Sequence, residues 1–155
     1  MDMPAPSPAV LSRKAQIVDR LQSVLPQGAV IHSDSEVRAY ECDALTAYKC
    51  PPLCAVLPSS TEEVAAALKI CHEMGVPVVP RGSGTSLAGG ALPTADCVIL
   101  GTARLNAVLE TNYEDRYIRV GSGRTNLSVT GAVEAEDFFY APDPSSQLAC
   151  AIAGN

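Results

Sequence analysis

A glycine-rich stretch, residues 80–91, holds the residues of this chain best suited to binding an anion. It reads Pro-Arg-Gly-Ser-Gly-Thr-Ser-Leu-Ala-Gly-Gly-Ala and follows a short apolar run, Val76 to Val79. Glycines lack a Cβ, so the backbone can adopt positive φ angles and approach a ligand closely. Successive amides in such a turn form a concave nest for phosphate oxygens, and Arg81 at its mouth could add charge-assisted hydrogen bonds. We therefore predict an anion-binding loop, with a pyrophosphate as the expected ligand.

This glycine loop departs from the two familiar phosphate-binding motifs. A P-loop requires a lysine at its end, and none follows here. The dinucleotide fingerprint requires glycines at its first, third and sixth positions; counting from Gly82, the third is Gly84 but the sixth is Leu87. Glycines downstream and Pro93 would interrupt a helix, so we expect loop amides to hold the anion. A glycine-rich turn that joins two strands and binds nothing is the alternative that composition leaves open.

The sequence before the loop predicts the elements that position it. Residues 53–57 form an apolar run of strand length, and Ser60 and Glu63 have the spacing of a capping box that opens a helix. Gly75 ends that helix, and the run 76–79 is the next strand. Residues 53–79 are therefore a βαβ unit, with a right-handed crossover expected. This unit places the glycine loop at the carboxyl end of a strand, where open α/β units bind ligands.

Hydrophobic periodicity and turn residues predict further elements on both sides of this unit. They are a helix at 9–25, strands at 30–31, 97–100, 108–110 and 117–120, a helix at 125–135 and a short aromatic strand at 138–140. The turn at 112–115 makes the last two long strands an antiparallel hairpin. The predicted fold class is α+β, a βαβ unit followed by a mixed or antiparallel sheet.

Composition excludes several classes of protein. Of the 155 residues, 47% are hydrophobic and 18% charged, which is typical of a folded domain. The net charge of −6 argues against a nucleic-acid partner. No apolar run approaches the roughly 18 residues of a membrane span, and the N-terminus has no basic segment followed by an apolar core. We therefore expect a cytoplasmic protein without a membrane span.

The six cysteines contain no Cys-x-x-Cys pair. Cys50 and Cys54 flank two prolines at a spacing of four, which is a weak zinc or iron–sulfur signal. Neither His32 nor His72 lies in a cluster with ligand spacing. Free thiols in a reducing compartment are the favoured interpretation, and no metal site is predicted.

A second loop, residues 140–147, reads Tyr-Ala-Pro-Asp-Pro-Ser-Ser-Gln, with two prolines that fix φ and two hydroxyls free to bond. Together with the glycine loop and the terminal Ala-Gly-Asn, it resembles the PCMH-type FAD-binding domain of the FAD-linked oxidases, the vanillyl-alcohol oxidase type. Residues 40–48 and 52–58 look like the glycolate-oxidase members of that family. The resemblance covers nearly everything after residue 30.

The resemblance implies two binding segments for FAD. The residues expected to hold the cofactor are Pro80, Arg81, Gly82, Ser83, Gly84, Thr85 and Ser86 in the glycine loop, and Pro142, Asp143, Ser145, Ser146, Gly154 and Asn155 in the second segment. Members that attach FAD covalently through the first loop have a histidine where this chain has Thr85, so non-covalent FAD is expected. Ala153 replaces a glycine that the family usually has, and its methyl group would alter contact with the cofactor.

The resemblance also implies an activity, hydride transfer from a small 2-hydroxy acid such as glycolate or D-lactate to FAD. Residues 1–48 would be a tail and helical lead segment, and residues 49–155 a FAD-binding domain incomplete at its C-terminus. The family's catalytic and metal-binding histidines lie outside the matched part, so no catalytic residue is predicted and the chain alone should be inactive. Partner subunits, one of them an iron–sulfur subunit, are implied. A D-lactate dehydrogenase-type fragment and a non-catalytic remnant or interaction module are the alternatives.

Overall fold

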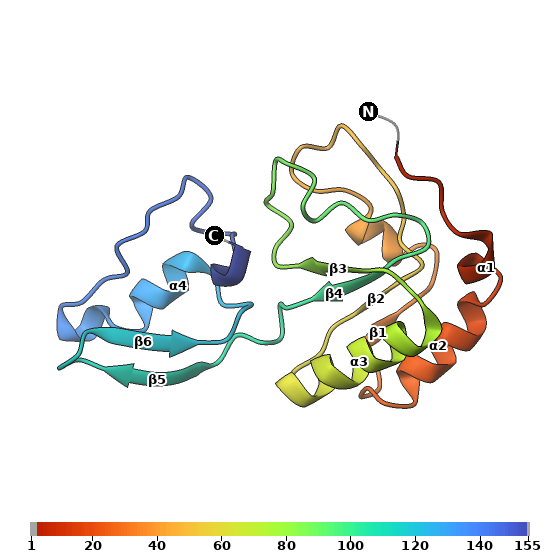
Figure 1. The fold of residues 1–155 in the computed structure, drawn as a ribbon. Coiled ribbons are helices and arrows are strands. Elements are labelled where there is room, and N and C mark those ends of the chain that lie inside the picture. Colours follow the sequence, from red (N-terminus) through yellow and green to blue (C-terminus); the bar gives the residue numbers. More distant parts are fainter. Residues whose placement is uncertain (1–2, 155) are drawn as a thin grey trace.

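The computed structural model describes residues 3–154 and contains two packed parts (Figure 1). The helices are α1 (Pro8–Leu11), α2 (Lys14–Gln22), α3 (Thr61–Met74) and α4 (Asn126–Gly131), with short 3₁₀ helices η1 (Val37–Tyr40), η2 (Glu134–Glu136) and η3 (Ile152–Gly154). The strands are β1 (Val30–Ile31), β2 (Cys54–Val56), β3 (Val78–Arg81), β4 (Val98–Gly101), β5 (Val108–Asn112) and β6 (Tyr117–Val120). The first four strands form one sheet and β5–β6 a separate hairpin. None of the helices in this range has both the length and the apolar character needed to cross a bilayer.

The four-stranded sheet has the order β1-β2-β4-β3, with β4 inserted between the two strands of the βαβ unit. Strands β2 and β3 both run parallel to β4, whereas β1 pairs with β2 in the antiparallel direction. Arg81, the last residue of β3, lies opposite Gly101, the last residue of β4. The predicted α+β class with parallel and antiparallel pairing is confirmed. Because neighbouring parallel strands end at the same edge, the glycine loop starts beside the segment that follows β4.

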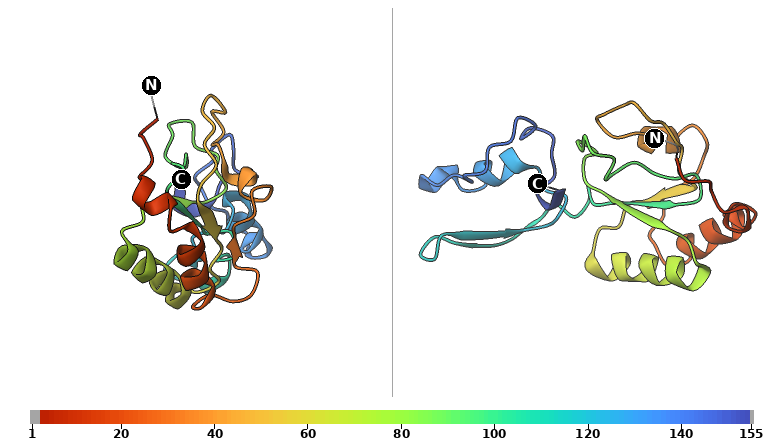
Figure 2. Two further views of the ribbon diagram at one scale, coloured as in Figure 1. Left: turned by 90° about the vertical axis from the view of Figure 1, so that its right-hand side faces the viewer. Right: turned by 45° about the horizontal axis from the view of Figure 1, so that its top comes forward.

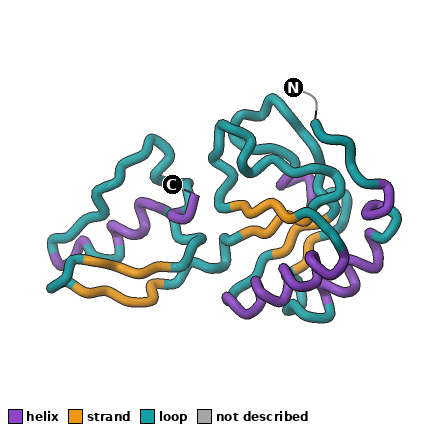
Figure 3. The backbone as a smooth tube through the Cα atoms, in the orientation of Figure 1, coloured by secondary structure: helices purple, strands orange, loops and turns teal. Residues whose placement is uncertain are grey.

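The central strands are buried on both faces, and alternate residues point to opposite sides. Val56 and Val98, both completely buried, belong to a cluster with residues of the helices, which lie on one face of the sheet (Figures 1 and 2). Ile99, also completely buried, faces the other side, where Tyr40 of η1 packs. That second side is covered mainly by loops (Figure 3). One of these loops is the glycine loop, so helices support the sheet while the opposite face remains available to build a site.

Helices α1 and α2 share this core. Ile17 and Leu21 are completely buried in the same cluster as Ile70 of α3. Arg20 and Glu73 join α2 to α3 through an ion pair of 2.8 Å. The segment 1–48 therefore packs into the same core as the residues after it. The domain boundary expected after residue 48 stays a prediction.

Helix α3 begins and ends at the predicted signals. The Ser60 hydroxyl accepts from the Glu63 amide at 3.2 Å, while the Glu63 carboxylate accepts from the amide of Ser59 at 2.7 Å rather than from that of Ser60. Gly75 follows the last turn with φ of 62°, a left-handed conformation that ends the helix. The reciprocal bonds of a capping box are thus present, with one of them shifted by one residue.

In contrast to α3, two predictions of local structure were wrong. The helix expected at 9–25 is interrupted at Ser12–Arg13, because the Ala9 carbonyl accepts from the Ser12 hydroxyl and from Arg13 Nε at 3.2 and 2.9 Å. The Arg13 amide bonds instead to Val10. The aromatic residues 138–140 are not a strand, since the Tyr140 amide donates to the Thr130 hydroxyl at 3.1 Å and holds this segment against α4.

The left-handed end of α3 can be tested with a matched pair of glycines. An added Cβ would meet no heavy atom within 4 Å at either Gly75 or Gly131, but only Gly75 has a positive φ. Gly75→Ala should lower the free energy of unfolding by about 1–2 kcal/mol, since a Cβ disfavours this conformation. Gly131→Ala, within α4, should cause no loss because alanine favours helix. Urea unfolding followed by circular dichroism measures both, and equal losses would contradict the interpretation.

Candidate functional site

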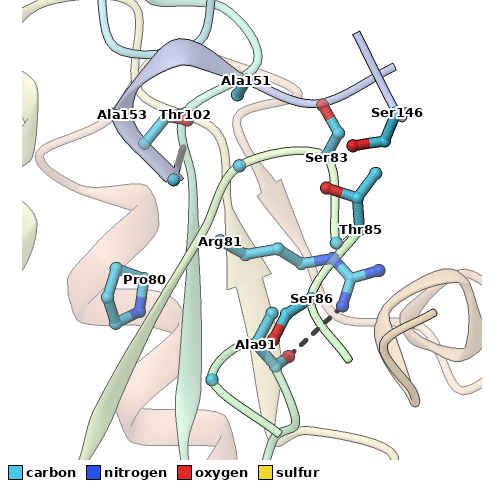
Figure 4. A pocket seen from close by; sticks show the side chains of 14 residues that line it. Pro80, Arg81, Ser83, Thr85, Ser86, Ala91, Thr102, Ser146, Ala151 and Ala153 are labelled. Atoms are coloured by element: carbon cyan, nitrogen blue, oxygen red, sulfur yellow. Dashed lines mark hydrogen bonds between the residues drawn. The ribbon is translucent and has the colours of Figure 1, made fainter. Parts of the chain in front are cut away.

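The two segments predicted to bind the ligand face each other across a cavity of about 450 Å³ (Figure 4). Its lining consists of Pro80 to Ser86, Gly90, Ala91, Thr102, Ser146, Ala151, Ala153 and Gly154. Every predicted residue of the glycine loop is therefore present, together with Ser146 and Gly154 of the second segment. Pro142, Asp143 and Ser145 belong to the same loop as Ser146 but do not line the cavity. Asn155 lies outside the described residues.

Two glycines of the loop permit close approach of the cavity walls. Gly84 has φ of +74°, and a Cβ there would overlap the guanidinium of Arg81, lying 2.9 Å from Nε and nearer still to Nη2 and Cζ. At Gly82, a Cβ would lie 2.8 Å from the Cβ of Ala151, on the opposite wall. Such separations are shorter than van der Waals contact. The absence of side chains at these positions is thus required by the local geometry.

The amides of residues 82–86 form no hydrogen bond with any acceptor in the part of the chain that the structure describes. The carbonyls at the two ends of this stretch are used: that of Arg81 accepts from the Thr102 amide at 2.9 Å, and that of Ser86 from the Ala44 amide at 3.1 Å. Backbone donors without a protein acceptor are satisfied by water or a ligand. Consecutive donors beside a cavity form the kind of nest that binds phosphate oxygens.

Arg81 is engaged by the main chain rather than free at the mouth. Its Nη1 donates to the carbonyls of Cys42 and Ala91, at 2.8 and 3.3 Å, and the second of these bonds is drawn in Figure 4. The guanidinium carbon lies 5.8 Å from the centre of the Tyr40 ring. The side chain still borders the cavity, so it contributes positive charge there while connecting separate segments.

The second wall is held by the start of α4. Asn126 is 1% exposed; its amide donates to the Cys150 carbonyl at 3.0 Å and its Nδ2 to the Pro142 carbonyl at 3.2 Å. Thr125 pairs with Ala151 as an isolated antiparallel bridge. Asn126 therefore fixes both ends of residues 142–150. No local signal in the sequence marks this role, because the partners of Asn126 depend on how the chain folds back.

Thr102 is a lining residue that sequence reasoning missed. Its Oγ1 is buried and has no hydrogen-bond partner among the described residues. The residue follows β4, and it reaches the cavity because β4 lies directly beside β3. No motif marks it; only the strand order could have shown that it adjoins the glycine loop.

The cavity can bind an anion but offers no acid or base. Arg81 is the one ionisable side chain among the described lining residues. All six cysteines are free, and burial raises the pKa of Cys54 to about 12 and that of Cys71 to about 11, so both stay protonated at neutral pH. Within residues 3–154, no three or more His, Cys, Asp or Glu residues are grouped so that they could hold a metal ion.

Residues 52–155 match the FAD binding domain family, and the chain belongs to that family. It is 45% identical over 142 residues to glycolate oxidase subunit GlcD of Escherichia coli K12, which covers 92% of this chain and 28% of that protein. A D-lactate dehydrogenase of Anaerostipes hadrus is 28% identical over 141 residues, 90% of this chain and 29% of its own. The chain thus spans less than a third of these relatives.

Among solved structures, 4-ethylphenol oxidase from Gulosibacter chungangensis has the same fold over 98% of this chain and 30% of its own, with a TM-score of 0.82 and 24% identity. The resemblance to the FAD-linked oxidases is confirmed, and FAD is the cofactor of this domain. The residues present fit its diphosphate, because consecutive unpaired amides and one guanidinium border the cavity.

The fit can be tested at two glycines that border the same cavity. Gly84→Ala should weaken FAD binding about tenfold or more, because the loop must leave its left-handed conformation and move away from Arg81. A Cβ at Gly90 would meet only Ser86 Oγ at 3.6 Å, an ordinary contact, so Gly90→Ala should change affinity by less than about threefold. Quenching of flavin fluorescence measures both. Equal affinities in the two variants would contradict the role of Gly84.

Proposed function

We propose that this chain is the FAD-binding part of a glycolate-oxidase-like 2-hydroxy-acid dehydrogenase. The observation that carries the proposal is the row of unpaired amides at residues 82–86 beside the cavity. The 45% identity to GlcD supports the assignment to glycolate oxidase in particular. Because the chain spans 28% of that relative, the complete reaction belongs to a larger protein.

In this proposal the two walls of the cavity contact different parts of FAD. The amides of residues 82–86 hold the diphosphate, and Arg81 adds positive charge nearby. Ser146 and Gly154 contact the cofactor from the opposite wall, with Pro142, Asp143, Ser145 and Asn155 continuing along the same segment. When bound, FAD supplies the hydride acceptor, and the protein supplies orientation and electrostatics. FAD is held non-covalently in this proposal; the lining residues that the structure describes include no histidine, cysteine or tyrosine to which flavin could be attached.

The substrate and the partner subunits are proposed by analogy with the relatives. The substrate is a small 2-hydroxy acid, and partner subunits, one of them an iron–sulfur protein, complete the enzyme. The relative GlcD is named as a subunit of glycolate oxidase, which supports the proposal of partner subunits. Six free cysteines support a cytoplasmic location, because disulfides are rare in reducing compartments. The net charge of −6 gives no reason to expect a nucleic-acid partner.

A D-lactate dehydrogenase-type flavoprotein is the second candidate, because such an enzyme also matches 90% of the chain. Its lower identity, 28% against 45%, favours the glycolate assignment. A remnant that binds nothing would leave the unpaired amides of the glycine loop without a role.

The proposal predicts flavin binding without turnover by residues 1–155. The purified chain supplied with FAD should be yellow, and acid precipitation should release all of the flavin into the supernatant because no covalent bond holds it. Dye reduction with glycolate or D-lactate should be absent for residues 1–155 and present for the complete protein, with glycolate the better substrate. The chain spans only 28% of GlcD and its cavity lacks an acid or base, which is the reason to expect no turnover.

Three results would count against the proposal. A colourless protein would rule out the FAD site, flavin retained in the acid pellet would rule out non-covalent binding, and glycolate-dependent reduction by residues 1–155 that tracks with bound flavin would overturn the expected inactivity. A preference of the complete protein for D-lactate would favour the second candidate.

A further inference from the structure

A segment outside the matched family region supports the glycine loop. Three contacts join them: Arg81 Nη1 donates to the Cys42 carbonyl at 2.8 Å, the Ala44 amide to the Ser86 carbonyl at 3.1 Å, and the Gly89 amide to Asp43 Oδ2 at 2.9 Å. The FAD binding domain match begins at residue 52, so residues 40–44 precede it. Both ends of the loop are thus attached to a segment that contributes no residue to the cavity lining.

The guanidinium of Arg81 lies at the centre of these contacts. It reaches from the end of β3 to two carbonyls, those of Cys42 and Ala91, which are far apart in the sequence. It lies over the ring of Tyr40 and directly against Gly84, so that a Cβ at Gly84 would overlap it. A planar group with several fixed donors can make all of these contacts at once, whereas an ammonium group cannot.

Asp43 supports the later half of the glycine loop, at Gly89. The residue is 5% exposed, and its carboxylate accepts from the amides of Leu45 at 3.0 Å and Gly89 at 2.9 Å. A buried carboxylate bonded to two amides fixes the backbone on both sides. Residues 42–44 therefore hold the loop at Arg81, Ser86 and Gly89, in addition to the sheet that precedes it.

We propose that Arg81 is a positioning residue: its guanidinium holds the glycine loop in the conformation that presents the amides of residues 82–86, by joining the loop to residues 40–43. This inference rests on the proposed function for the identity of the ligand. It assigns Arg81 to the support of the phosphate-binding backbone instead of to a direct bond with phosphate. It also assigns Tyr40 and Asp43, which do not touch the cavity, to the affinity for FAD.

The two roles of Arg81 predict different results for a lysine. A phosphate ligand needs positive charge, so Arg81→Lys would keep most of the affinity that Arg81→Gln loses. A positioning residue needs the planar guanidinium with its several donors, so Arg81→Lys and Arg81→Gln should both weaken FAD binding about tenfold or more. The affinities of the two variants should lie within about threefold of each other. ADP, which carries the diphosphate without the flavin, should lose affinity in parallel. The measurements are FAD titration by flavin fluorescence and competition by ADP.

Arg104 provides the matched control. Its guanidinium also donates to two main-chain carbonyls, those of Leu57 and Gly28 at 3.4 and 3.1 Å, but it does not line the cavity. Arg104→Lys should therefore leave FAD affinity within about twofold. If the Arg81 variants do not fold, Tyr40→Leu tests the same contact with the charge kept: it should weaken FAD and ADP about two- to fivefold, whereas Tyr40→Phe, which keeps the ring face, should not.

The outcomes separate this inference from the proposed function. A wild-type protein that does not bind FAD overturns the proposed function. A wild-type protein that binds FAD, with Arg81→Lys at wild-type affinity and Arg81→Gln impaired, overturns only the positioning role and makes Arg81 a charge ligand. Loss of FAD affinity without loss of ADP affinity also overturns it. Parallel losses in both ligands, with Arg104→Lys unchanged, support it.

Discussion

The site depends on a row of main-chain amides that have no acceptor among the residues that the structure describes. Residues 82–86 can present them because Gly84 adopts a φ of +74° and lies directly against the Arg81 guanidinium. Both features require the absence of a Cβ. Backbone donors have a fixed geometry and no side-chain rotamers to lose, so a loop held in this way is organised for an anion before the anion arrives. The positive charge beside it comes from a side chain whose Nη1 is already bonded to carbonyls.

The order of strands explains how this loop obtains the rest of its cavity. With β4 between β2 and β3, the end of the βαβ unit lies beside Gly101 and Thr102, and the chain then continues into the β5–β6 hairpin. The hairpin and α4 return the chain to the same place, where Asn126 holds the second wall. Two segments far apart in the sequence, residues 80–86 and 146–154, therefore line one cavity. In Figure 1 the dark-blue turn at the C-terminal end lies near the end of β3.

Local signals predicted most of the elements because they act over a few residues. The strands of the sheet were recognisable as apolar runs, and α3 was bounded by Ser60 and Gly75. The failures occurred where distant or side-chain partners replaced local backbone bonds. Arg13 takes the Ala9 carbonyl and also reaches Met74, which interrupts the first helix, and Thr130 captures the amide of Tyr140, which prevents a strand.

The sequence by itself predicted an anion-binding loop at residues 80–91, because its glycines permit positive φ angles and close approach of the backbone, while the second segment was assigned from the family resemblance. It also contained the family resemblance that the comparison with FAD binding domains confirmed. Only the tertiary structure decided that Arg81 bonds to Cys42 and Ala91, that Thr102 and Ala151 complete the lining, and that Asn126 holds the second loop. These contacts join residues that are far apart along the chain, and no local preference of the backbone encodes which of them will meet.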